Sequence, residues 1–478
     1  MFKLVSLFSG AGGLDLGFKL AEGFDLLFAN EILDPPCRTY SKIFNAKIIS
    51  SKEISRYAPF ALNSTPAIYN LLSLTAKEKS PFIINGSIEE IDFSSLPFDY
   101  SDVVLGGPPC QDFSIIRGKD ERKGIDVKRG QLYSYFIKAL VKLQPKIFVF
   151  ENVPGLKSAN SGYAYKTITD DFQKLNLRWS NIRKIVGNGA KENKIEGYSL
   201  IFNDIVDFSK LGVPQIRKRL IIIGLRNDLI ENDFEISEIQ NKVKLILEGS
   251  KKLFRLFPMT PIEVFEGKTL PELNDSYRAV MNDYSNLCEQ NLTKMAENWK
   301  INVWNRLKLD IVEDYLFFNS INKKDFNDSF EHALKEHEEV LRKLGYYGVP
   351  VSENDEFIES SEVLKRLFLI PPGGNYEFVK GTEYEVKALM SNIYRRLNPL
   401  VPSPAVIAYG GGGTWGYHYK RSRGKLTNKE RARLQTFPLN VDFSGSTQEV
   451  RAQIGEAVPP IGAYNIALAV KEILKIIK

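Results

Sequence analysis

The stretch Leu4-Val-Ser-Leu-Phe-Ser-Gly-Ala-Gly-Gly-Leu14 passes from an apolar run into a glycine-rich turn. The apolar run predicts a strand over Leu4–Phe8, and the pattern after the turn predicts a helix over Leu14–Ala21. Glycines there let the backbone approach a ligand closely, and the helix N-terminus favours an anionic group. The alternative is an ordinary tight strand–helix turn. Because a P-loop lysine and the dinucleotide spacing are both missing, the turn favours a nucleoside ligand without a pyrophosphate, such as S-adenosylmethionine.

The same alternation of short apolar runs and helical patterns continues through the first half of the chain. It predicts an α/β fold with a mostly parallel sheet and helices on both faces. Residues 50–80 form an insertion without a predicted structure. The expected strands are Phe24–Ala29, Phe82–Asn85, Val103–Leu105, Ile147–Phe150 and Leu220–Gly224, and the expected helices are Pro36–Phe44 and Gln131–Leu143.

The alternation breaks near residue 226, where longer charged helical stretches such as Phe326–Leu344 begin. Sheet and loop signals return near Arg395, and a last helix is expected over Ile461–Ile477. We therefore predict that 1–225 and 391–478 together form one catalytic, cofactor-binding domain. Residues 226–390 are expected to form a second, smaller lobe, and the last helix is expected to pack back onto the N-terminal sheet.

The formal charge of +6 is unevenly distributed along the 478 residues. Residues 226–390 carry an acidic excess, whereas both flanking segments are basic. A polyanion would therefore be held by the flanks. The basic side chains expected to do this are Lys420, Arg421, Arg423, Lys425, Lys429, Arg431 and Arg433.

Cysteine and histidine usage argues against a disulfide framework and a metal site. Cys37, Cys110 and Cys288 are an odd number of widely spaced cysteines, which suits a reducing cytoplasm. His332 and His337 are predicted to be surface residues of a charged helix. No apolar run reaches membrane-spanning length, and the N-terminal run flows into the glycine turn without a cleavage site, so a cytoplasmic protein is expected.

Gly106-Gly-Pro-Pro-Cys-Gln-Asp-Phe-Ser114 places Cys110 directly after a buried-looking strand. Two consecutive prolines stiffen the turn and give the thiol one preferred direction. The end of a strand is also where an open α/β sheet keeps its chemistry. A small buried hydrophobic residue is the alternative, but the prolines and the polar Gln111 and Ser114 favour a nucleophile.

Two further groups are expected at the same edge of the sheet. Glu151 follows the strand Ile147–Phe150 directly, where partial burial would raise its pKa and let it share a proton with a substrate nitrogen. A helix cap or an ion-pair partner is the alternative. Arg217 and Arg219 alternate along the segment leading into the last strand, and charges before so apolar a strand are usually paired or bound to a ligand.

These segments, in this order, resemble the cytosine-5 DNA methyltransferase family, in its prokaryotic restriction-modification form. The matching blocks lie at both ends of the chain and leave 226–390 unmatched, which in the family is the target-recognition region. They are Phe8-Ser-Gly-Ala-Gly-Gly13, Glu31, Gly107-Pro-Pro-Cys-Gln111, Glu151-Asn-Val153, Gln215-Ile-Arg-Lys-Arg219, Arg396-Leu397, the run from Leu426 to Pro438, and Gln453-Ile-Gly-Glu-Ala-Val-Pro-Pro460.

The resemblance implies a Rossmann-like S-adenosylmethionine-dependent methyltransferase that flips a cytosine out of duplex DNA. It implies Cys110, Glu151, Arg219 and Arg217 as catalytic residues. It also implies a monomer, and pairing with a cognate restriction endonuclease. The implied cofactor contacts are Phe8, Gly10, Ala11, Gly12, Gly13, Glu31, Ile32, Ser87, Ile88, Pro108, Leu132, Glu456 and Ala457, and the implied DNA contacts are Gln111, Ser114, Gln215, Lys420, Arg421 and Arg423.

Two positions depart from the family pattern. Ser87 stands where an aspartate usually accepts from the adenine amino group, so a neutral acceptor replaces a charged one. Glu456 stands where an asparagine is common, which removes a donor and adds a negative charge. That carboxylate would either repel the methionine carboxylate of the cofactor, point away, or pair with the methionine ammonium.

Three alternatives are distinguished by particular residues. An amino-methylating enzyme would carry an aromatic residue where Cys110 stands. An RNA (tRNA) cytosine-5 methyltransferase of the same family typically lacks a recognition insert as long as 226–390, so duplex DNA is favoured. A non-catalytic relative would have lost Cys110, Glu151 or the arginines, and all of these are present.

Overall fold

The structure is a computed structural model. It describes residues 1–50, 80–91, 93, 100–109, 132–186, 194–250, 252–255, 257–273, 275–276, 278–280, 282, 323–352, 360–387, 392–410, 413–414, 416–420 and 423–477. The predicted sites Cys110, Gln111, Ser114 and Arg421 lie outside these residues, as does most of the 50–80 insertion.

An eight-stranded sheet in the order β3-β4-β2-β1-β5-β6-β8-β7 forms the centre of the molecule. The six strands from β3 to β6 are parallel, and β8 runs antiparallel to both of its neighbours. The α/β fold with a mostly parallel sheet is therefore confirmed. The strands are β1 (Phe2–Leu7), β2 (Phe24–Glu31), β3 (Lys47–Ser50), β4 (Phe82–Asn85), β5 (Val103–Gly106), β6 (Ile147–Asn152), β7 (Tyr198–Asp207) and β8 (Lys218–Arg226).

Strand order reverses between β1 and β5, which are hydrogen-bonded neighbours with Leu7 opposite Gly106. From β1 the chain continues to β2 and β4 on one side, whereas β5 leads to β6 on the other. In open α/β sheets, ligands bind at the carboxyl ends of the strands where this reversal occurs. The glycine turn after β1 and the proline turn after β5 both lie at this point.

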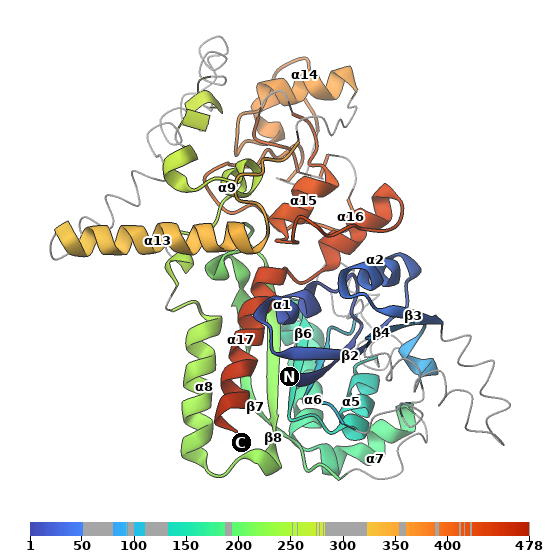
Figure 1. Cartoon of the computed structure of the whole chain (residues 1–478). Helices are drawn as coiled ribbons and strands as arrows, with labels where there is room; N and C mark the ends of the chain where they lie inside the picture. Colours follow the sequence, from blue (N-terminus) through green and yellow to red (C-terminus); the bar gives the residue numbers. More distant parts are fainter. Residues whose placement is uncertain are drawn as a thin grey trace.

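Helices cover both faces of the sheet (Figure 1). Along β5, Val103 and Leu105 join the apolar cluster that contains residues of α1 and α17, whereas Val104 joins the cluster that contains residues of α5. The helices are α1 (Gly13–Ala21), α2 (Asp34–Phe44), α5 (Leu132–Leu143), α6 (Tyr163–Gln173), α7 (Leu175–Val186), α8 (Asp233–Leu247), α9 (Pro261–Glu266), α13 (Lys323–Lys343), α14 (Ser361–Leu369), α15 (Asn428–Leu434), α16 (Thr447–Glu456) and α17 (Pro460–Ile476).

The last helix returns to the N-terminal part of the sheet, as predicted. Helix α17 packs against α1 and lies beside α8 (Figure 1). The two helices approach so closely that a Cβ added at Gly17 would lie 2.3 Å from the Cβ of Ala463. Residues more than 400 positions apart thus build one layer.

Contacts cross both boundaries predicted for the second lobe, at 226 and 391, and the division itself stays a prediction. Helix α8 packs on β7 and α17, so it belongs to the layer that covers the sheet. Residues beyond 391 contact the segment predicted to form the second lobe, because the Tyr376 amide donates to the Ile393 carbonyl and Arg396 to the Leu367 carbonyl. Charged side chains lie on exposed surface wherever a segment packs. The charge distribution therefore could not show that α8 packs against the sheet layer.

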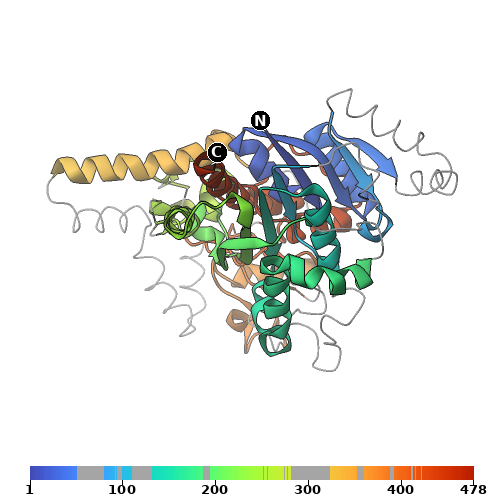
Figure 2. The same cartoon turned by 90° about the horizontal axis from the view of Figure 1, so that it is seen from below.

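Helix α13 extends away from the sheet in both views (Figures 1 and 2). His332 on this helix is exposed, as expected, but the prediction of a surface position for His337 was wrong. The His337 ring is buried, with Nδ1 against the Glu263 carboxylate and Nε2 2.9 Å from the Phe257 carbonyl. It joins α13 to the start of α9. None of the described helices is both long and apolar enough to cross a membrane.

Candidate active site

The turn between β1 and α1 is shaped by positive φ angles and by close packing. Phe8, Gly10 and Gly12 have φ of +56°, +55° and +83°. A Cβ at Gly12 would lie 2.8 Å from the Tyr40 ring, and one at Gly13 would lie 2.3 Å from the Val458 carbonyl oxygen. At Gly10, by contrast, the space beside the backbone is open. Neighbouring atoms therefore fill the space beside Gly12 and Gly13, whereas the turn is accessible at Gly10.

Glu31 ends β2 and holds the open part of this turn. Its carboxylate accepts from the Gly10 amide and from the Leu33 amide, both at 2.9 Å. Burial raises the pKa of Glu31, the two backbone donors oppose the shift, and the nearby Glu456 carboxylate adds to it. Beside it, Ile32 and Leu33 are 61% and 52% exposed. Such an arrangement suits a nucleoside, with hydroxyl groups on the carboxylate and a base against the apolar side chains.

The other predicted cofactor contacts lie along the same edge. Ser87 is partly accessible, and its hydroxyl accepts from the Glu89 amide at 3.3 Å, which caps a short 3₁₀ turn that begins at the buried Ile88. The Pro108 carbonyl accepts from Asn152 Nδ2 at 3.2 Å. Leu132 begins α5 and Ala457 follows α16. The residues present therefore fit S-adenosylmethionine.

Glu151 and Arg219 form an ion pair at the carboxyl end of β6. Arg219 Nε lies 2.9 Å from Glu151 Oε1, and the two side chains are 17% and 14% exposed. Burial raises the pKa of Glu151, while Arg219 and then Arg217 act in the opposite direction. A Cβ added at Gly107 would lie 3.0 Å from the other carboxylate oxygen. The turn that leads to Cys110 therefore starts beside this pair.

Arg217 occupies an internal position behind this ion pair. The residue is 2% exposed, and its guanidinium donates to the carbonyls of Val406, at 3.2 Å, and Gly455, at 2.8 Å. Its Nε is buried without a partner among the described residues. Arg217 thus joins β8 to the segment that carries Glu456, and it supports the site through protein contacts.

Comparison with known proteins agrees with this geometry. The family model for C-5 cytosine-specific DNA methylases matches residues 2–64 and 74–472. A DNA (cytosine-5-)-methyltransferase of Aeropyrum pernix, M.ApeKI, is 48% identical over 99% of both chains. The type II methyltransferase M.NgoFVII of Neisseria gonorrhoeae is 29% identical over 98% of this chain and 86% of its own length. The chain belongs to the C-5 cytosine-specific DNA methylase family.

A solved structure supports the fold of this methylase. A DNA modification methyltransferase encoded within an E. coli prophage superposes with a TM-score of 0.53 at 19% identity, covering 99% of this chain and 100% of its own. The family membership makes this protein a DNA (cytosine-5)-methyltransferase with a Rossmann-like sheet. The expected enzyme class and fold are therefore confirmed.

Gln215, expected to contact DNA, is fully buried in this methylase. Its Nε2 donates to the Leu434 carbonyl at 2.8 Å, and its Oε1 accepts from the Val406 amide at 3.0 Å. The expectation is corrected: the amide ties β8 to the C-terminal segment and has no surface to offer DNA. The local sequence, in which Gln215 lies between a proline and an isoleucine, does not indicate that its side chain is buried.

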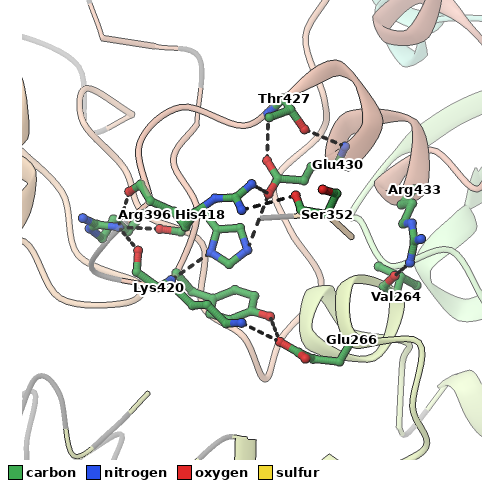
Figure 3. A network of polar contacts seen from close by, with 11 residues as sticks. Val264, Glu266, Ser352, Arg396, His418, Lys420, Thr427, Glu430 and Arg433 are labelled. Atoms are coloured by element: carbon green, nitrogen blue, oxygen red, sulfur yellow. Dashed lines mark hydrogen bonds and ion pairs between the residues drawn. The ribbon is translucent and has the colours of Figure 1, made fainter. Parts of the chain in front are cut away.

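The basic side chains expected to hold the DNA backbone are largely engaged inside the protein (Figure 3). Lys420 pairs with Glu266 at 3.0 Å, and Arg423 pairs with Glu430 at 2.9 Å. Arg431 and Arg433 are buried, and Arg433 donates to the Val264 and Val349 carbonyls, both at 2.7 Å. Arg431 and Arg433 are too buried to offer their charges to a phosphate, so the expectation is corrected for these two, whereas a DNA contact by Lys420 and Arg423, which are partly exposed, stays a prediction.

Arg396 and His418 complete this network, and His418, with Glu266, Lys420, Arg423 and Glu430, lines a cavity of about 340 Å³. Arg396 is 1% exposed and donates to the carbonyls of Leu367 and Lys420. His418 Nδ1 accepts from the Lys420 amide at 2.9 Å. Burial, followed by the neighbouring Arg423, Lys420 and Arg396, lowers the pKa of His418 well below its usual value, so the ring is neutral. The network joins α9 to the segment before α15.

Sequence reasoning missed a buried carboxylate beneath the cofactor turn. Asp15 is 1% exposed and accepts from Tyr40 Oη at 2.9 Å, while its Oδ2 has no partner among the described residues. Burial raises its pKa to about 6, although hydrogen bonds from Ser6 and Tyr40 oppose the shift. The available signal was an acidic residue flanked by leucines in the first turn of an apolar helix.

Proposed function

We propose that this methylase transfers a methyl group from S-adenosylmethionine to carbon 5 of a cytosine flipped out of a specific double-stranded DNA sequence. The observation that supports it most is the Glu151–Arg219 pair beside Gly107. This pair lies at the end of β6, and only β5 separates β6 from β1, which leads into the glycine turn. The pair would face the base, and the turn would hold the cofactor. The implied product of the cofactor is S-adenosylhomocysteine.

The cofactor would lie against Gly10, with its ribose on Glu31 and its adenine against Ile32. Ser87, Ile88, Pro108 and Leu132 would border the adenine, as the resemblance implies. When bound, S-adenosylmethionine supplies an electrophilic methyl group. The chain's own residues must then make carbon 5 of cytosine nucleophilic.

Cys110 would activate the ring by adding its thiolate to carbon 6, which leaves an electron-rich enamine ending at carbon 5. Glu151 would hydrogen-bond ring nitrogen 3 and the exocyclic amine, since its raised pKa allows it to share a proton there. Arg219 would hold the 2-carbonyl oxygen. After methylation, loss of the carbon 5 proton and elimination of the thiol restore the aromatic ring and the free cysteine.

Transfer of tritiated methyl groups tests both the chemistry and the nucleic acid. The wild-type protein is expected to label duplex DNA and to leave tRNA unlabelled. Cys110→Ala should lower the rate by about 1,000-fold or more. Cofactor binding, measured by calorimetry, should survive. A mutant with a rate near wild type would exclude covalent catalysis by Cys110, and labelling of tRNA alone would favour the RNA enzyme.

A fluorinated cytosine in the target site provides an independent readout. Because fluorine replaces the carbon 5 proton, elimination cannot occur, and a covalent protein–DNA adduct should accumulate with wild type. Cys110→Ser should form no adduct that survives denaturing electrophoresis. An adduct through another residue would contradict the assignment.

Sequence recognition is assigned to the second lobe. Exchange of residues 226–390 for the equivalent segment of a relative should change which cytosine is methylated. The type II names of the relatives also support a role in restriction-modification, with a cognate endonuclease as functional partner. Cells carrying such an endonuclease should lose viability when Cys110 is replaced.

A further inference from the structure

A buried hydrogen bond joins α1 to α2 next to the glycine turn. Asp15 lies in the first turn of α1 and is 1% exposed, and its Oδ1 accepts from Tyr40 Oη at 2.9 Å. Tyr40, on α2, is fully buried. Asp15 Oδ2 has no partner among the described residues. Because a buried polar group without a partner costs free energy, this contact fixes the two side chains to each other.

The ring of Tyr40 fills the space beside Gly12. A Cβ added at Gly12 would lie 2.8 Å from this ring and 2.7 Å from the ring of Phe44, and the two rings stack with their centroids 4.3 Å apart. Gly10, Gly12 and Gly13 leave the turn with many accessible backbone conformations. Packing from outside the turn must therefore select one of them, and the Tyr40 ring supplies this packing at Gly12.

Helix α2 also contacts the other segments that border the cofactor site. It begins two residues after Glu31, and it lies against α16 (Figure 1). Thr39 Oγ1 donates to Gln453 Oε1 of α16 at 2.6 Å. Helix α16 leads into Ala457, whose Cβ would lie 3.1 Å from a Cβ added at Gly13. A change in how α2 sits against α1 would therefore reach both sides of the glycine turn.

We propose that Asp15 is a positioning residue for S-adenosylmethionine, because its carboxyl holds Tyr40 and Tyr40 holds the glycine turn in the conformation that binds the cofactor. This rests on the proposed function and deepens it. Asp15 is too buried to reach a ligand, so its effect passes through Tyr40 to Gly12. The oxygen that accepts from Tyr40 carries this role, and the negative charge is not needed for it.

Calorimetric titration of the full chain with S-adenosylmethionine and with S-adenosylhomocysteine tests the contact. Asp15→Ala removes the acceptor, and Tyr40→Phe removes the donor while keeping the ring. Each should weaken both ligands about 5- to 10-fold, since only part of the population then has the binding conformation. The double variant should bind within about 2-fold of either single variant, because both changes remove the same contact. Asp15→Asn keeps an acceptor and should bind within about 2-fold of wild type.

A second buried tyrosine–aspartate contact provides a matched control. Asp171, on α6, is 5% exposed and accepts from Tyr133 Oη, also at 2.9 Å. Residues of α6 belong to the apolar cluster on the other face of the sheet from α1. Asp171→Ala should lower the melting temperature and leave the affinity for both ligands unchanged. Equal weakening in this control and in Asp15→Ala would overturn the proposal.

Steady-state kinetics separates positioning from a simple loss of folded enzyme. In Asp15→Ala the KM for S-adenosylmethionine should rise about 5- to 10-fold, while kcat at saturating cofactor stays within about 2-fold of wild type. A lower kcat with an unchanged KM would mean fewer folded molecules and would overturn the proposal. If Asp15→Ala does not fold, Tyr40→Phe gives the same readout.

Two further outcomes are decisive. Binding by Asp15→Asn as weak as that of Asp15→Ala would overturn the role assigned to the acceptor oxygen. Failure of the wild-type protein to bind either ligand would instead contradict the proposed function.

Discussion

Two carboxylate–arginine pairs in this methylase look alike in the sequence and differ in their surroundings. Glu151 and Arg219 are 14% and 17% exposed at the carboxyl edge of the sheet, and the main partner of each is the other. Glu430, in α15, and Arg423, shortly before it, are 1% and 15% exposed. Glu430 also accepts from the Thr427 amide at 2.7 Å and lies 3.6 Å from His418. The carboxylate of Glu430 is occupied by several protein partners, which suits a structural role. Glu151 has fewer protein partners, so its carboxylate can still accept a hydrogen bond from, or share a proton with, a ligand.

The largest expected difference is in the rate of methyl transfer. Glu151→Gln keeps the shape of the first pair and removes its ability to share a proton. The single-turnover rate should fall about 100- to 10,000-fold. Cofactor affinity and melting temperature should stay close to wild type. A rate within a factor of about two of wild type would remove Glu151 from the chemistry.

The second pair should respond in stability. Glu430→Ala removes a capping acceptor and leaves Arg423 beside a buried histidine, so the free energy of unfolding should fall by about 3–5 kcal/mol. Urea denaturation measures it. Glu338→Ala, in an exposed ion pair on α13, is the control and should have little effect. An unchanged denaturation midpoint in Glu430→Ala would show that the network is not structural.

Asp15 provides a third case for the comparison, because it is a buried carboxylate whose neighbours among the described residues are hydroxyl groups and not cations. Its pKa is about 6 in the fold against 3.8 ordinarily, so its contribution to stability is fully present below pH 3.8 and is lost as pH rises through 6. The wild type should therefore lose on the order of 3 kcal/mol across this window relative to Asp15→Asn. Denaturation at several pH values measures the difference, with the exposed Asp25→Asn as control.

The smallest expected effect concerns DNA binding. Lys420 is already paired with Glu266, so Lys420→Gln should leave the number of released counterions, and with it the slope of affinity against salt, nearly unchanged. Fluorescence anisotropy at several salt concentrations measures the slope. A loss equivalent to a full phosphate contact would return Lys420 to the DNA interface.

The sequence correctly predicted the positions of polar residues that lie at the ends of strands. Glu31 and Glu151 lie at the carboxyl edge because parallel strands place their ends together, and hydrophobic alternation located those strands. It was less accurate for Gln215 and Arg433. Both are polar residues whose partners are backbone carbonyls 30 or more positions away, and local patterns contain no information about such partners.

The predicted boundaries of the second lobe also depend on contacts between distant residues, which local sequence patterns do not show. Its boundaries depend on which surface α8 and residues 392–398 pack against, and that choice is made by tertiary contacts. The charge distribution located a change in surface composition near 226. It did not locate the change in packing, which comes after α8.

The return of α17 to α1 has a consequence for synthesis in the cell. Gly13 and Gly17 lie directly against Val458 and Ala463, which are synthesised more than 400 residues later. Chains generally fold in the order in which they are made. A nascent chain therefore lacks the contacts that α17 makes with α1 until that helix has been synthesised. The glycine turn is completed by a segment made more than 400 residues after it.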